Sequence, residues 1–131
     1  MHWRNRFFII SSLIYALIAG LIGIVRLISP SVIPGNVPRL HGHLMLLGFV
    51  GMFIYGVGLH VLPRFSGRPL YSEHLATVQF FVANAGLWIM IFGWLINYNY
   101  IVMFGGTLVW TAMLMFSLNI MLTVRRYGPR G

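Results

Sequence analysis

Two histidines separated by a single residue, His41 and His43, stand at the start of a long apolar stretch that continues to Pro63. An imidazole is costly in a hydrocarbon environment, so it is usually retained there because a function uses it. Neutral imidazole is also the commonest metal ligand among protein side chains. The pair therefore indicates a metal-binding role, with hydrogen-bonded packing residues as the alternative.

The spacing of the pair limits what it can bind. Residues two apart on an α-helix point about 200° away from each other, so His41 and His43 cannot hold one metal from the same helix. They would serve two sites on opposite sides of the helix. The other histidines, His2, His60 and His74, lie near a terminus, the far end of the stretch or a loop. A second copy of the chain must then supply the partner ligand. In a closed ring of copies, two imidazoles on one iron describe a low-spin, non-covalent b-type heme.

Arginine and glycine residues near the pair fit this interpretation. Arg26 and Arg39 lie on the same side of the predicted membrane as the histidines, where the sequence places no carboxylate. Heme propionates would supply the missing anions through charge-assisted pairs, although lipid phosphates could do the same. Gly42 and Gly48 allow a flat ring, or a neighbouring helix, to approach the backbone closely.

The composition is that of an integral membrane protein. Of 131 residues, 59% are hydrophobic and only 8% are charged, where a soluble domain would carry about a quarter. Nine arginines face one acid, Glu73, and they lie at the edges of apolar runs, which favours lipid contact over nucleic acid binding. The absence of cysteine excludes disulfides, iron–sulfur clusters and covalent c-type heme.

The apolar runs predict one all-α domain, 1–131, with four transmembrane helices at roughly residues 7–28, 40–62, 75–96 and 100–124. Each is long enough to cross about 30 Å of hydrocarbon. We expect Pro63 to stop the second helix and Ser72 or Glu73 to begin the third.

The distribution of arginine predicts the orientation. Positive residues accumulate on the cytoplasmic side of a membrane. Seven of the nine fall on one side of the four predicted helices: Arg4, Arg6, Arg64, Arg68, Arg125, Arg126 and Arg130. We expect a multi-pass protein of the cytoplasmic (inner) membrane with both termini inside. His41 and His43 then lie near the outer surface.

The segments His41–Met45, Gly48–Phe49 and Leu62–Leu70 resemble the NnrS family, which has a His-x-His-x-Met…Gly-Phe helix followed by a Pro…Gly-Arg-Pro loop. The chain is also similar to the catalytic subunit of heme–copper oxidases, whose twelve helices form three arcs of four. That resemblance implies a homotrimer with three identical arcs and a heme-ligand role for His41 and His43. The copper ligands do not carry over, because the predicted helix 75–96 contains no histidine.

The sequence therefore predicts a b-type heme membrane protein acting in electron transfer or in a response to a diatomic gas such as NO or O2. Its expected partners are its own copies, the lipid bilayer and a redox partner of undetermined identity, with no nucleic acid. One alternative is a heme-free transporter or assembly factor whose histidines and arginines line a polar path. Another is a terminal oxidase or nitric oxide reductase, for which the second metal lacks ligands. Whether the protein is an enzyme stays open; an enzyme of this kind would be an oxidoreductase.

Overall fold

Long apolar segments separated by links rich in Pro, Gly and Asn fold here into helices that run back and forth. The computed structural model describes residues 1–125. The helices are α1 (Trp3–Ile28), α4 (Glu73–Leu95), α5 (Asn99–Arg125) and a second span built from α2 (Val37–His43), η1 (Leu44–Gly51) and α3 (Met52–Phe65). Within the described residues, these four spans are each long and apolar enough to cross a membrane, which indicates a multi-pass membrane protein.

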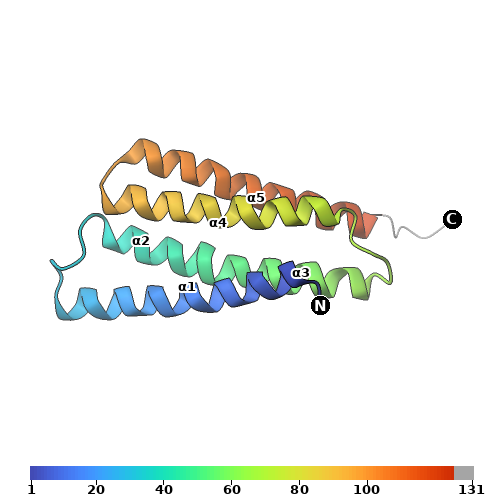
Figure 1. The fold of residues 1–131 in the computed structure, drawn as a ribbon, viewed down its shortest axis with the longest axis horizontal. Helices are drawn as coiled ribbons and strands as arrows, with labels where there is room; N and C mark the ends of the chain where they lie inside the picture. Colours follow the sequence, from blue (N-terminus) through green and yellow to red (C-terminus); the bar gives the residue numbers. More distant parts are fainter. Residues whose placement is uncertain (126–131) are drawn as a thin grey trace.

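The spans pack as two pairs (Figure 1). α4 lies along α5, and α1 lies along η1 and α3, while α2 contacts both α1 and α4. The start of α1, the link between α3 and α4 and the end of α5 lie together at what we call the terminal end. The links between α1 and α2 and between α4 and α5 lie at the opposite end, which carries His41 and His43 and which we call the His41–His43 end.

The spans begin at residues that satisfy free backbone N–H groups. Asn36 accepts a hydrogen bond from the N–H of Arg39 at 3.3 Å, so the second span starts at Val37 rather than at the predicted residue 40. Ser72 accepts from the N–H of Leu75 at 3.1 Å and caps α4 where the sequence predicted. Side-chain caps of this kind replace the backbone partners that the first turn lacks.

The predicted stop at Pro63 is wrong, because α3 continues to Phe65. Proline removes one backbone donor, and near the end of a helix that loss concerns a single hydrogen bond. Ser66 closes the helix instead: its N–H and its hydroxyl both donate to the carbonyl of Leu62, at 3.0 and 2.7 Å. Gly67 then turns the chain with a φ of +69°, a conformation that favours glycine.

The π-helix η1 keeps the buried side of the second span continuous. Leu40, Leu44, Gly48 and Met52 are all buried and follow one another at intervals of four residues. On a regular α-helix such a row drifts by about 40° per step. A π-helix holds more residues per turn and drifts in the opposite sense. The widened segment therefore keeps all four residues on the same, buried side of the span.

Arg4 is not a headgroup anchor, as its place among the edge arginines suggested. Its side chain is 1% exposed, and its guanidinium donates to the carboxylate of Glu73 at 2.8 Å. The same guanidinium also donates to the carbonyl of Glu73 at 3.0 Å, to the hydroxyl of Thr77 at 3.3 Å and to the side chain of Asn5 at 3.2 Å. The one acid of the chain therefore joins the start of α1 to the start of α4.

Further polar contacts inside the membrane spans also join separate parts of the chain. The hydroxyl of Tyr15 on α1 donates to the side-chain oxygen of Asn84 on α4 at 2.6 Å. Asn119 on α5 accepts from the N–H of Ser72 at 3.0 Å and donates to its carbonyl at 2.8 Å. These polar groups form hydrogen bonds within the protein because the hydrocarbon of a membrane offers them no hydrogen-bond partner.

The buried position of Arg4 gives a test of the fold. Arg4→Gln removes the partner of Glu73 and should lower the free energy of unfolding by about 2 kcal/mol. Arg6→Gln removes the same charge from an exposed position at the same end and should change it by less than about 0.5 kcal/mol. Thermal unfolding in one detergent measures both. Equal melting temperatures for the two variants would contradict this role of Arg4.

Candidate functional site

His41 lies on α2 with its ring turned towards α1. Its Nδ1 is 2.8 Å from the carbonyl oxygen of Ala19. The ring also lies close to Gly23, where a methyl group would come within 3.1 Å of the His41 Cε1. The glycine of α1 therefore makes room for this imidazole, and the carbonyl one turn earlier fixes its orientation.

His43 lies on the same helix with its ring turned towards α4. Its Nδ1 is 2.8 Å from the carbonyl oxygen of Arg39, one turn earlier on α2. Its ring centroid is 4.5 Å from that of Trp94. The two histidines thus contact different neighbouring helices.

The hydrogen bonds determine which nitrogen of each ring is free. A carbonyl oxygen only accepts, so Nδ1 of both His41 and His43 carries the proton and donates it. In a neutral imidazole the other nitrogen, Nε2, then holds a lone pair. No group among residues 1–125 hydrogen-bonds to either Nε2. Each ring is therefore oriented as a metal ligand usually is, with its second nitrogen fixed by a carbonyl.

A hollow of about 300 Å³ lies beside His41 at the surface between α1 and α2. Its lining includes Gly23, Arg26, Leu27 and Pro38. The guanidinium of Arg26 donates to the carbonyl of Pro30. The lining of the hollow is almost entirely apolar, with Arg26 and His41 among its residues.

The other three predicted site residues, Arg39, Gly42 and Gly48, differ in their surroundings. Arg39 is exposed, and Gly42 is open, with no atom within 4 Å of where a methyl would stand. Gly48 is buried, and a methyl there would come within 2.9 Å of Tyr15 and 3.1 Å of Leu87. The need for glycine at position 48 comes from helix packing, so we do not place it at a cofactor. Gly42 stays a prediction.

The remaining histidines do not join this pair. His2, His60 and His74 lie at the terminal end. Within residues 1–125, no three His, Asp or Glu side chains gather where they could hold a metal ion. Residues 1–125 of a single chain therefore offer one free imidazole nitrogen on each side of α2 and no second ligand beside either.

Sequence reasoning found the histidines but missed what holds them. Gly23 gives a weak signal, since a small residue in a membrane helix marks a close approach. The sequence carries no signal for the contacts with Trp94 and with the carbonyl of Ala19, because it does not show which helix each ring packs against.

Comparison of the chain with known protein families, curated protein sequences and solved structures gives no match.

The tautomers can be measured directly. In protein prepared without heme and labelled with ¹⁵N-histidine, His41 and His43 should both show a protonated Nδ1 and an unprotonated Nε2 at neutral pH. Comparison with His41→Ala and His43→Ala assigns the signals. A ring with a protonated Nε2 and an unprotonated Nδ1 would mean that the carbonyl contact of that residue is not formed.

Proposed function

We propose that this protein is an integral membrane b-type heme protein in which each heme is held between two copies of the chain. His41 of one copy and His43 of the next would hold its iron. The observation that carries this proposal is the pair of free Nε2 atoms on opposite sides of one helix, each on a ring whose Nδ1 donates to a carbonyl.

The donor set fits heme iron better than it fits other metals. A low-spin b-type heme needs only one neutral imidazole on each face. A structural metal ion bound by side chains would need three or four ligands, and no such group exists within residues 1–125. His41 and His43 of one chain diverge, so the two faces of one heme require two chains.

Arg26 and Arg39 would hold the heme propionates. Both lie at the His41–His43 end, whereas the one acid of the chain, Glu73, lies at the terminal end beside Arg4. A guanidinium near the membrane without a carboxylate favours an external anion. Arg26 borders the hollow beside His41, which supports this role for it first.

The assembly we propose is a homotrimer in the cytoplasmic membrane. Its number of copies comes from the resemblance to the three helical arcs of heme–copper oxidases. The orientation is supported by arginine: seven of the nine are described, and five of these seven lie at the terminal end, all but Arg26 and Arg39. Arg126 and Arg130 lie outside the described residues. Both termini are then cytoplasmic, and the hemes lie near the outer surface.

Electron transfer is the activity that this arrangement supports best. Heme bound there supplies a reversible one-electron couple. The two imidazoles would be the ligands of the iron, the carbonyls of Ala19 and Arg39 keep the rings in place, and no coordination position would stay open to a diatomic gas.

Shared ligation predicts a specific pattern of heme content. The wild type should bind one heme per chain, and His41→Ala and His43→Ala should each lose nearly all of it, because every seam loses one ligand. His74→Ala, an exposed histidine at the other end, is the control and should keep its heme. Heme absorbance per chain, with subunit number from the mass of the intact complex, measures this.

Mixing the two variants separates shared from internal ligation. In rings formed from equal amounts of differently tagged His41→Ala and His43→Ala chains, about one seam in four regains both histidines. Heme should return to that fraction of the wild-type content. No recovery in verified mixed rings would exclude ligation between copies, and a colourless wild type from heme-supplied cells would favour the heme-free transporter.

The occupied axial positions predict insensitivity to gas. Reduced wild-type protein should keep its absorption spectrum when carbon monoxide is added, since both histidines stay bound. His43→Ala protein with residual heme should respond to the gas, which controls for the assay. If carbon monoxide shifts the absorption spectrum of the wild type, the protein binds gas, and the proposal of electron transfer is wrong.

A further inference from the structure

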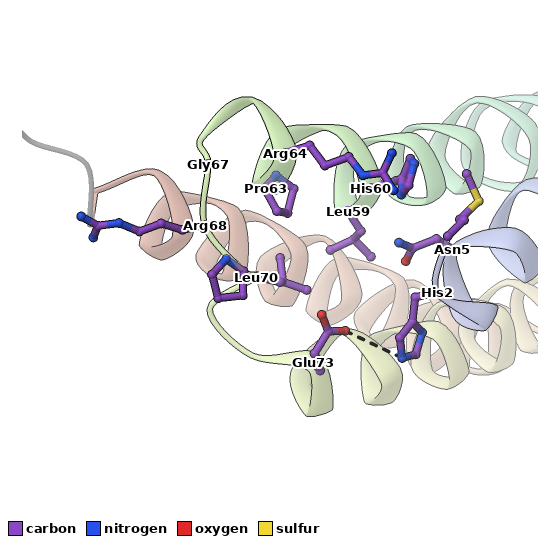
Figure 2. Close-up of a pocket in the computed structure, with 12 residues that line it drawn as sticks. His2, Asn5, Leu59, His60, Pro63, Arg64, Gly67, Arg68, Leu70 and Glu73 are labelled. Carbon is purple, nitrogen blue, oxygen red and sulfur yellow. Dashed lines mark ion pairs between the residues drawn. The ribbon is translucent and has the colours of Figure 1, made fainter.

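A second cavity of the described chain lies at the terminal end, far from His41 and His43. Its volume is about 460 Å³, and it opens between the start of α1, the last turns of α3 and the start of α4. Figure 2 shows His60 and Arg64 on one side of it and His2 with Glu73 on the other, with Leu59 and Pro63 between them. Its wall is half polar, although it stands at the end of a membrane span.

The only carboxylate in this wall is already neutralised. Glu73 lies 2.8 Å from the buried guanidinium of Arg4, and the His2 Nε2 is 4.0 Å from the same carboxylate oxygen. The remaining titratable groups of the wall are basic side chains. Arg68 also belongs to the wall, but Figure 2 shows it turned away towards α5, and no step here depends on it.

Three hydrogen-bond donors of this wall have no partner among residues 1–125. Asn5 is 3% exposed, and its side-chain oxygen accepts from the Arg4 Nε at 3.2 Å, so its amide NH2 is the free group. Figure 2 shows Asn5 reaching into the space between His60 and His2. His60 and Arg64, one turn apart on α3, make no hydrogen bond within the described chain. This amide nitrogen is not among the fully buried atoms, so a ligand or water in the cavity can reach it.

We propose that this cavity binds a phosphate group, namely the phosphodiester of an anionic phospholipid. Arg64 supplies the charge, His60 and the Asn5 amide supply further donors, and no unpaired carboxylate opposes the anion. The lipid is favoured over a free phosphate because the cavity ends a membrane span and because its apolar side includes Leu59 and Leu70. This proposal is independent of the heme.

The test uses the full-length protein in phosphatidylcholine nanodiscs that contain a minority of phosphatidylglycerol. Native mass spectrometry counts the phosphatidylglycerol molecules that stay bound to each chain. Arg64→Gln should weaken this binding about fivefold, and adding His60→Gln should weaken it further. Arg6→Gln is the matched control: it removes the same charge from an exposed position at the same end but outside the cavity.

Folding and the identity of the anion are checked separately. In phosphatidylcholine alone, Arg64→Gln should melt with the wild type, because Arg64 has no partner to lose within the described residues. Phosphatidylglycerol should raise the melting temperature of the wild type and not that of Arg64→Gln, whereas inorganic phosphate should raise neither. Equal loss of lipid in Arg64→Gln and Arg6→Gln would overturn the proposal. Stabilisation by inorganic phosphate without any by phosphatidylglycerol would overturn the lipid assignment.

Discussion

A helix carries side chains two positions apart to opposite sides of its axis, and the arrangement at the His41–His43 end follows from this constraint. The His41 ring contacts α1 and the His43 ring contacts α4, so each imidazole packs against a different helix. The carbonyls of Ala19 and Arg39 then use up the Nδ1 proton of each ring. What is left on each side is a nitrogen lone pair that no residue of the described range 1–125 binds. We proposed a heme at the interface between copies because these two nitrogens lack a ligand or hydrogen-bond partner within the described residues.

The two ends of the molecule differ in how they handle positive charge. At the terminal end, Glu73 neutralises Arg4 and joins two spans, so part of the charge stays inside the fold. At the opposite end, Arg26 and Arg39 have no acid of the chain near them. A guanidinium close to hydrocarbon needs either an anion or access to water. The charge of Arg4 is thus balanced by an acid of the same chain, whereas the charges of Arg26 and Arg39 are not.

Much of the fold could be predicted from the sequence because its signals are local. The four spans were predictable because each apolar run, as a helix, is long enough to cross the bilayer. Ser72 predicted the start of α4. The tight link before α5 was also visible, and there Asn97 takes the positive φ of 55° that asparagine tolerates. The errors concern tertiary contacts. Only the packing of α1 against α4 shows that Arg4 is buried, and only the Ser66 cap explains why α3 passes Pro63.

In the candidate site, too, the features set by local geometry could be predicted, whereas those set by tertiary packing could not. That His41 and His43 diverge follows from helical geometry, but their neighbours depend on how the spans are rotated against each other. Sequence periodicity therefore could not identify Gly23 or Trp94 as the residues in contact with the rings.

The π-helix η1 sets the angular phase between the histidines of α2 and the residues of α3. If Leu44–Gly51 formed a regular α-helix with the same number of residues, α2 would rotate relative to α3, because an α-helix holds fewer residues per turn. α3 could stay packed on α1, while His41 would leave the Ala19 carbonyl and His43 would leave Trp94. The winding of this one segment, more than its apolar composition, thus decides where both imidazoles point.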